Sequence, residues 1–313
     1  MRSAKTNIAT NVPGPTVCRT VRLPWPVDLP RTVLPLLRGA GDPTARIAGG
    51  TVWRATRTPD GAATVRVRQA AADTLEIEAV GPGAEHSAHF DGPGLFGAFD
   101  DVSQFVPPAD GPVARIWRRR RGILLTRADP FPVLVAAILE QKVTGIEARR
   151  AWRSIVRRTA EPAPGGTGLL LPPDPGRLAS LPSWELHRVG VVDRRAAALR
   201  EVARHAARVT ALATLPLNEA KSFLRALPGV GPWTAAEVAR TALGDADAVS
   251  VGDFHLPHLV CWALAGEPRG DDGRMLELLE PFRGQRGRVQ LLLEAGGAHA
   301  PSFGPKLEPR SFV

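Results

Sequence analysis

The chain has 313 residues, enough to bury the core of one large domain or of two modest ones. Its formal net charge of +9 favours a polyanionic partner, but it does not separate DNA from RNA or an acidic membrane surface. Cys18 and Cys261 are the only cysteines, which excludes a disulfide framework, a paired-cysteine zinc site and a four-cysteine iron–sulfur cluster. The sequence has no apolar signal region and no run of about 18 apolar residues, so we expect a cytoplasmic protein without a membrane span.

Residues 1–16 have no hydrophobic periodicity and are predicted to be a loose tail. The next segments, 51–57, 63–68 and 74–78, alternate between apolar and polar residues, and the sequence Pro59-Asp60-Gly61 marks a turn between the first two. This pattern predicts a small antiparallel sheet with one buried face and one solvated face. Its predicted buried residues are Val52, Val65, Val67, Leu75 and Ile77, and its predicted solvated residues are Arg66, Arg68, Glu76 and Glu78.

The composition of residues 81–112 is rich in Gly, Pro, Asp and Phe, which favours turns and short helices. The run Arg118–Arg121 that follows is compatible with contacts along a phosphate backbone and equally with a solvated basic face. Asp129-Pro130 then has the pattern of a helix start, an N-cap residue followed by a first-turn proline. Thr144 and Glu147 have the spacing of a capping box, so a second helix is predicted there after a short bend over 141–143.

Asp193 and Asn218 are candidate N-caps for two further amphipathic helices. After the second of these, Gly229 and Gly231 flank one apolar residue and allow a sharp turn with several outward N–H groups. Pro232 fits the first position of the next helix, whose N-terminus adds partial positive charge. The segment therefore predicts a helix, a hairpin and a helix that hold a phosphate without reading the base sequence.

The sequence Leu-Pro-Gly-Val-Gly-Pro-Trp-Thr-Ala over 227–235, followed by Gly252-Asp253, resembles the helix-hairpin-helix DNA glycosylases. Among them it is most similar to the bacterial DNA-3-methyladenine glycosylase II group. The resemblance implies an α+β fold, with a small antiparallel-sheet domain over 17–112, a mainly helical catalytic domain over 113–300 and a tail over 301–313. It also implies a monomer that acts on double-stranded DNA containing damaged bases, in the cytoplasm of a bacterium and close to its nucleoid.

Asp253 matches the catalytic aspartate of this family, whose carboxylate stabilises positive charge on the sugar and helps a water to attack. The alternative is that Asp253 only caps the helix after it. Trp233 stands where strand-cleaving relatives have a lysine nucleophile, which favours base hydrolysis without strand cleavage. Its indole would stack on an electron-poor alkylated base, with packing in the core as the alternative.

Glu237 and Gln285 stand where the resemblance implies aromatic side chains of the base pocket. Glu237 would favour a cationic methylated base or accept hydrogen bonds from a neutral base. The alternative is a solvent-facing glutamate on a helix. The predicted base pocket therefore consists of Trp233, Glu237 and Gln285.

DNA contacts are also implied by the resemblance, at the hairpin and at the bend after the first long helix. The inserting residue of the family corresponds to Lys142, with a surface lysine as the alternative, and His255 borders the flipped nucleotide. The predicted DNA-binding residues are Gly229, Val230, Gly231, Thr234, Gln141, Lys142, Val143 and His255. His255 and His258 alone are weak evidence for zinc, so no metal ligand and no required cofactor are predicted. A structural monovalent cation at the hairpin is implied by the family.

The sequence thus predicts a monofunctional DNA glycosylase that removes alkylated purines of the 3-methyladenine type in base excision repair. Two alternatives stay open. The first is a glycosylase for oxidised or deaminated bases, and the second is a non-catalytic protein that binds DNA or senses lesions.

Overall fold

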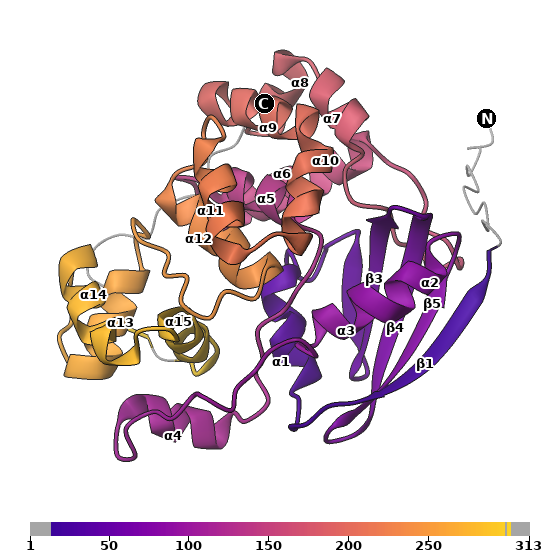
Figure 1. The fold of residues 1–313 in the computed structure, drawn as a ribbon. Coiled ribbons are helices and arrows are strands. Elements are labelled where there is room, and N and C mark those ends of the chain that lie inside the picture. Colours follow the sequence, from indigo (N-terminus) through magenta and orange to yellow (C-terminus); the bar gives the residue numbers. More distant parts are fainter. Residues whose placement is uncertain (1–13, 298, 302–313) are drawn as a thin grey trace, which may run out of the picture.

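The computed structural model describes residues 14–297 and 299–301, which form one antiparallel sheet and a larger set of helices (Figure 1). The predicted α+β fold class is confirmed. Most of the predicted tails, 1–16 and 301–313, lies outside the described residues, and the first strand already begins at Thr16. No helix in the described part of the chain combines the length and the apolar character needed to cross a membrane.

The sheet has five antiparallel strands in the order β1-β5-β4-β3-β2. The three central strands confirm the strands predicted from alternation, and the two edge strands were not predicted. The strands are β1 (Thr16–Arg22), β2 (Ala45–Ala48), β3 (Thr51–Thr58), β4 (Gly61–Ala71) and β5 (Thr74–Val80).

The two faces of the sheet differ as the alternation predicts. Val52 lies opposite Val67, and Val67 lies opposite Ile77, so these side chains line one face across three strands. Each of the three is at most 2% exposed. On the other face the predicted polar residues pair across β4 and β5, with Arg66 bound to Glu78 and Arg68 bound to Glu76.

Short helices follow the sheet, as the Gly- and Pro-rich composition of 81–112 predicts. They are α2 (Ala84–His86), the π-helical turn η2 (Ser87–Asp91) and α3 (Gly92–Leu95). These segments pass across the sheet in Figure 1. A Cβ on Gly92 would lie 2.9 Å from Ile77 Cγ2, so this helix packs tightly on the buried face of the sheet.

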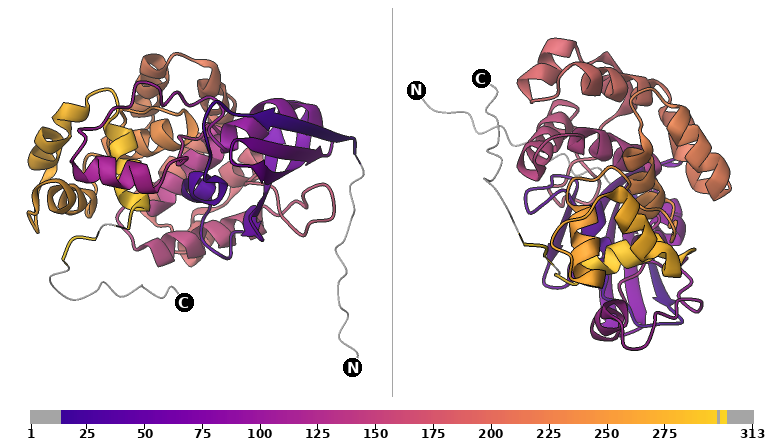
Figure 2. Two further views of the ribbon diagram at one scale, coloured as in Figure 1. Left: turned by 90° about the horizontal axis from the view of Figure 1, so that it is seen from below. Right: turned by 90° about the vertical axis from the view of Figure 1, so that its left-hand side faces the viewer.

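Apart from the strands and the connecting loops, the described chain is helical (Figure 2). The longer ones carry most of the core and the candidate site, and the short ones connect them. Their bounds are α1 (Leu29–Val33), η1 (Leu34–Leu36), α4 (Pro112–Arg119), α5 (Pro130–Glu140), α6 (Gly145–Arg158), α7 (Pro175–Ser180), α8 (Ser183–Arg188), α9 (Asp193–Arg204), α10 (Ala206–Thr210), η3 (Ala211–Thr214), α11 (Leu217–Ala226), α12 (Pro232–Ala242), α13 (Leu256–Ala265), α14 (Asp272–Leu279), η4 (Glu280–Phe282) and α15 (Arg286–Ala295).

Local capping explains where two of the longer helices begin. Asp129 accepts a hydrogen bond from Phe131 N (3.0 Å) and caps α5, as predicted. The predicted capping box at α6 is also confirmed, because Thr144 and Glu147 bond each other's backbone N–H groups. Between the two helices lies the predicted bend.

Two other predicted caps are wrong. The N-cap positions of α9 and α11 belong to Val192 and Pro216, and neither helix has a capping hydrogen bond from its N-cap side chain. Asp193 and Asn218 lie inside the first turns. At α11 the physical reason is Pro216, whose fixed backbone φ allows the helix to begin at the residue after it.

The sheet and the first helices share one hydrophobic core. It runs from Val65 and Ile77 of the sheet to Ile138 of α5, Trp152 of α6 and Leu199 of α9, all buried. A second core joins α4 to α13, α14 and α15. The division into domains at 17–112 and 113–300 stays a prediction.

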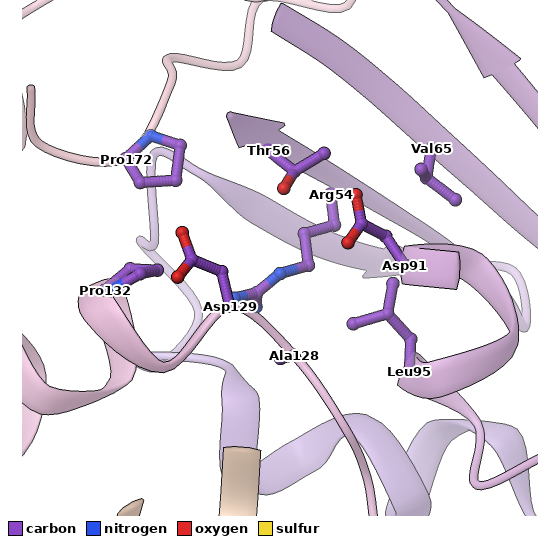
Figure 3. A pocket seen from close by; sticks show the side chains of 9 residues that line it. All are labelled: Arg54, Thr56, Val65, Asp91, Leu95, Ala128, Asp129, Pro132 and Pro172. Atoms are coloured by element: carbon purple, nitrogen blue, oxygen red, sulfur yellow. The ribbon is translucent and has the colours of Figure 1, made fainter. Parts of the chain in front are cut away.

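A small polar cavity of about 10 Å³, the size for one water molecule, lies where the sheet meets the start of α5 (Figure 3). Arg54 of β3 reaches toward Asp91 of η2 and Asp129, and these three side chains are called the Arg54 cluster below. Burial raises the pKa of both carboxyl groups and lowers the pKa of Arg54. Ser87 donates to Asp91 (2.9 Å) and Thr210 donates to Asp129 (2.8 Å).

Candidate active site

The predicted helix, hairpin and helix are present as α11, the turn 227–231 and α12. The two glycines of the turn have different surroundings. Gly229 has φ +83°, and a Cβ there would lie 2.5 Å from Ala198 Cβ of α9, so this position requires glycine. A Cβ on Gly231 would meet open space. The backbone at Gly231 is therefore accessible to a ligand at the N-terminus of α12.

The bend between α5 and α6 is tied to this hairpin. Gln141 Nε2 donates to the carbonyl oxygen of Gly229 and to Thr234 Oγ1, each at 2.9 Å. Lys142, next to it, is exposed and has a positive φ of 53°. Val143 is partly buried. The structure thus brings the predicted inserting segment and the predicted phosphate-binding hairpin side by side.

Not every predicted DNA-binding side chain in the hairpin faces solvent. Val230 is 6% exposed and packs in the core, and Thr234 is 2% exposed and bonds Gln141. Contacts from these two residues to DNA would therefore use backbone groups. His255 is exposed.

Asp253 is held by hydrogen bonds at both carboxylate oxygens. Its Oδ1 accepts from the backbone N–H groups of His255 (2.7 Å) and Leu256 (2.9 Å), so it anchors the start of α13. Its Oδ2 accepts from the indole Nε1 of Trp233 at 2.9 Å. Trp233 is the second residue of α12, so this bond places the carboxylate beside the hairpin. The orientation of the Asp253 carboxylate is fixed without a ligand.

One helical turn beyond Trp233, Glu237 belongs to a network that the sequence analysis did not predict. Arg240 donates to Glu237 Oε1 (2.6 Å) and to Glu294 Oε2 of α15 (3.2 Å), and these three side chains are called the Arg240 cluster below. Ser250, three residues before Asp253, also donates to Glu237 Oε1. Gln290 joins the network by donating to Glu294 Oε1 at 2.9 Å.

Charge within the Arg240 cluster is unbalanced, because two carboxylates share one guanidinium. The two carboxylates raise the pKa of Arg240 although its burial opposes this shift. Burial raises the pKa of Glu294, and Arg240 lowers it in part. Asp253 lies close enough to influence both groups electrostatically. The charges of the cluster and of Asp253 are therefore electrostatically coupled.

Gln285, the third predicted pocket residue, has other partners. It lies at the N-cap position of α15, and its Oε1 accepts from Arg288 Nε at 2.7 Å. Arg288 is 1% exposed at its side chain and forms a bidentate ion pair with Asp100. Within the described chain, Gln285 forms no hydrogen bond with Trp233 or Glu237. Its assignment to the base pocket stays a prediction.

The residues that sequence reasoning missed are Arg240, Gln290 and Glu294, and they lie at helical spacings from one another or from residues that it predicted. Trp233, Glu237 and Arg240 follow an i, i+4, i+7 pattern on α12, and Gln290 and Glu294 follow an i, i+4 pattern on α15. Such spacings place polar groups on one face of each helix. What the sequence does not contain is the ion pair that joins the two helices, between Arg240 of α12 and Glu294 of α15.

The basic run Arg118–Arg121 lies at the end of α4. Arg118 donates to the carbonyl oxygen of Ala109 (3.0 Å), and three of the four arginines are exposed. No group of three or more His, Cys, Asp or Glu side chains among residues 14–297 and 299–301 is arranged to hold a metal ion.

Solved DNA glycosylases share this arrangement of an antiparallel sheet followed by a helical unit. A 3-methyladenine DNA-glycosylase from Archaeoglobus fulgidus superposes with a TM-score of 0.72 at 18% identity, covering 89% of this chain and 98% of that protein. An 8-oxoguanine glycosylase/lyase from Clostridium acetobutylicum, bound to double-stranded DNA with cytosine opposite 8-oxoguanine, superposes with a TM-score of 0.58 at 16% identity. The match covers 80% of this chain and 96% of that protein.

Sequence comparison gives a more local match. A curated thymine-DNA glycosylase from Aeropyrum pernix is 33% identical over 121 residues, which are 37% of this chain and 47% of that protein. The chain thus matches about half the length of this curated relative. No family model matches the chain. The predicted fold family is confirmed at the level of the fold.

Proposed function

We propose that this chain is a monofunctional DNA glycosylase that extrudes an alkylated purine of the 3-methyladenine type from duplex DNA and hydrolyses its N-glycosyl bond, in base excision repair. The observation that carries the proposal is Asp253, whose carboxylate is fixed beside the hairpin by Trp233 and by two backbone N–H groups. Fold likeness to 3-methyladenine and 8-oxoguanine glycosylases supports it.

The chemistry follows from the fixed carboxylate. As the bond between C1′ of the sugar and the base nitrogen breaks, positive charge develops on the sugar, and a carboxylate stabilises that charge. Asp253 Oδ2 accepts one hydrogen bond from Trp233 and keeps a second lone pair for an attacking water. Water adds to C1′ through its oxygen and gives one proton to the Asp253 carboxylate, and the base leaves with the electrons of the broken bond. Trp233 supplies no amine, so no covalent bond to the protein forms at this position.

The surrounding surface fits a duplex partner. The open backbone at Gly231 would bind a phosphate at the N-terminus of α12, and Lys142 on the adjoining bend would enter the duplex where the base leaves. We propose further that the chain acts as a monomer on chromosomal DNA in the cytoplasm and requires no cofactor. A monovalent cation on the hairpin carbonyls is part of this proposal.

Single-turnover base release tests the activity. Duplexes carrying 3-methyladenine, 7-methylguanine, hypoxanthine or 8-oxoguanine are compared between the wild type and Asp253→Asn, which keeps a capping oxygen. We expect release without strand nicking, slowed by roughly 10²–10³-fold in the variant, the scale for losing one preorganised electrostatic group. Asp271→Asn is the matched control, since Asp271 caps α14 through the N–H of Arg274.

The outcomes separate the rival functions. Equal rates in the wild type and Asp253→Asn would remove Asp253 from the chemistry. Binding to every duplex without release from any would indicate a non-catalytic DNA-binding protein. Release confined to hypoxanthine or 8-oxoguanine would favour a glycosylase for oxidised or deaminated bases, the alternative that the name of one similar protein brings forward.

The two hairpin glycines provide a matched pair for the DNA contact. Gly231→Ala adds a methyl group in open space at an extended backbone, φ −86° and ψ −179°, so we expect a stability change below about 1 kcal/mol. Its affinity for duplex DNA should nevertheless fall, because the methyl group stands where a phosphate would approach. Gly229→Ala should lower the free energy of unfolding by more than about 1 kcal/mol. A φ of +83° is unfavourable for alanine, and the added Cβ would collide with Ala198. Thermal unfolding and fluorescence anisotropy measure both, and unchanged affinity in Gly231→Ala would contradict a phosphate site there.

A further inference from the structure

The helix α4 and the two residues after it carry a concentrated positive charge that the proposed mechanism does not use. Five arginines fall within seven residues, and four of the five are exposed. They are called the α4 patch below and comprise Arg115, Arg118, Arg119, Arg120 and Arg121. The first three follow an i, i+3, i+4 pattern, so they lie on one face of the helix.

The opposite face of α4 attaches the patch to the helices that follow the candidate site. Val113 is buried in the second core together with Leu256 of α13, and α4 packs against both α13 and α15. In Figure 1, α4 lies below these two helices. The backbone N–H of Leu256 donates to Asp253. The α4 patch is therefore presented by the same packed unit that holds the candidate catalytic carboxylate.

No carboxylate neutralises the α4 patch. None of its arginines forms an ion pair within residues 14–297 and 299–301, and the bonds recorded for them go to neutral acceptors. Arg115 donates to the carbonyl oxygen of Asp110, and Arg118 donates to that of Ala109, each at 3.0 Å. A carbonyl oxygen orients a guanidinium but does not cancel its charge. The patch therefore presents an uncompensated positive surface.

The stability of α4 does not require five cations. The negative end of a helix dipole carries roughly half an elementary charge, which cations compensate only from the last turn. Arg118 and Arg119 already occupy that turn. Arg115 and Arg119 form an i, i+4 pair of like charge, which destabilises a helix. A polyanionic partner would relieve this repulsion.

We propose that the α4 patch binds the phosphate backbone of duplex DNA outside the lesion and holds the protein on undamaged DNA between lesions. The inference takes DNA as the partner from the proposed function and adds a second contact surface to the hairpin. Guanidinium groups suit this partner because they donate two parallel hydrogen bonds to the oxygens of a phosphate. Contacts to phosphates carry no base-sequence information, and they weaken as salt rises.

Equilibrium binding to an undamaged duplex tests the α4 patch. The triple variant Arg118→Gln/Arg119→Gln/Arg121→Gln is titrated with a fluorescent duplex by anisotropy, at salt concentrations between about 50 and 200 mM. We expect the slope of log affinity against log salt to become shallower by about 2–3, since each phosphate contact contributes about 0.9. Affinity at about 0.1 M salt should fall by at least about tenfold.

The control is Arg22→Gln/Arg66→Gln/Arg68→Gln, which removes the same formal charge from the sheet. Each of these three arginines is exposed and paired with a carboxylate. The control should change the slope by less than about 1. Thermal unfolding verifies that each variant is folded. If the triple variant does not fold, Arg119→Gln and Arg121→Gln are measured singly, and each should make the slope shallower by about 0.9.

Because an undamaged duplex offers no base to release, this test is separable from that of the activity. An unchanged slope in the α4 variants, or an equal change in the control, would overturn the inference even if the wild type releases damaged bases. Binding to duplex RNA or to phosphatidylglycerol vesicles that depends on the α4 patch, with DNA binding unchanged in the variants, would also overturn it. A slope that depends on the α4 patch in a protein that releases no base would uphold the inference and reject the glycosylase activity.

Discussion

The Arg240 cluster and the Arg54 cluster both contain one guanidinium and two carboxylates, and yet they differ in contact and in access. Arg240 lies 2.6 Å and 3.2 Å from its two carboxylates. Arg54 donates to the carbonyl oxygen of Leu36 at 3.2 Å, and within the described residues no carboxylate lies close enough to form an ion pair with it. A narrow cavity lies between its members (Figure 3).

The pKa directions follow this difference. Direct contact raises the pKa of Arg240 against the effect of burial, whereas burial outweighs the more distant carboxylates and lowers the pKa of Arg54. The comparison teaches that charge composition alone does not define a site. The Arg240 cluster turns acceptors outward beside Asp253, and the Arg54 cluster turns its charges toward one another where the sheet meets α5.

The largest expected effect is the loss of either arginine. Arg240→Met would leave two carboxylates without their paired cation, and we expect it to destabilise the protein by about 3–5 kcal/mol. Arg54→Met should destabilise the protein less than Arg240→Met does. Asp91 and Asp129 do not contact Arg54 directly, and their pKa values are already raised. Urea unfolding at pH 7 measures both, and a larger loss for Arg54→Met would break the comparison.

A smaller effect is expected from removing one neutral donor to a carboxylate near each cluster. Trp233→Phe deletes the indole bond to Asp253, and Thr210→Val deletes the hydroxyl bond to Asp129. Each should cost about 1–3 kcal/mol of stability, the range for a hydrogen bond to a charged group. Only Trp233→Phe should slow base release, by roughly tenfold, because in the proposed mechanism Asp253, and not Asp129, stabilises the sugar cation. Slower release in Thr210→Val at a temperature where it is folded would contradict this separation of roles.

The smallest effect concerns pH. Asp91 has a raised pKa in the folded protein, so it binds its proton more tightly when folded than when unfolded. Its contribution to stability therefore falls as the pH rises from about 4, the unfolded pKa, through the higher folded pKa. Asp91→Asn removes this dependence, and Glu294→Gln should do the same in the other cluster.

The stability of Asp91→Asn relative to the wild type should therefore improve between pH 4 and pH 7, on the order of 1 kcal/mol, and the improvement for Glu294→Gln should be smaller because solvent screens the partly exposed Glu294. Chemical denaturation across this pH range measures the difference. An advantage that instead shrinks as the pH rises would mean that the folded-state pKa of the group is lowered, not raised. Asp73→Asn is a useful contrast, because Arg22 lowers the pKa of Asp73. The stability of Asp73→Asn relative to the wild type should therefore fall, and not rise, as the pH increases through this range.

The elements that sequence analysis predicted are those governed by local rules. Asp129 and the Thr144/Glu147 pair define helix starts through bonds within four residues, and the strands β3 to β5 follow from alternation. The strand β2 spans only four residues between Pro43 and two glycines, too few for a period to be recognised. The strand β1 is an edge strand with little buried surface to produce an alternating pattern.

The candidate site shows the same limit. The hairpin and Asp253 were identified because their residues lie close together in the sequence. Glu294 and Gln290, in contrast, are linked to Glu237 only through Arg240 and Ser250, which they contact in the folded chain, and the nearby Gln285 accepts from Arg288 instead. A difference of a few positions along a helix decides which neighbour a side chain meets, and only the folded chain contains that information.

Lys142 has a left-handed backbone conformation, with φ +53°, that glycine would adopt without steric cost. A side chain in this conformation is disfavoured by about 1–2 kcal/mol. Within residues 14–297 and 299–301 this occurs only at Lys142 and at Asp193, and aspartate tolerates it better than lysine does. The bend beside the hairpin is thus less stable than it would be with glycine, and at its tip the chain retains a long cationic side chain. Strain of this kind, stored at an exposed turn, is an argument for function at Lys142 that does not depend on likeness to any other protein.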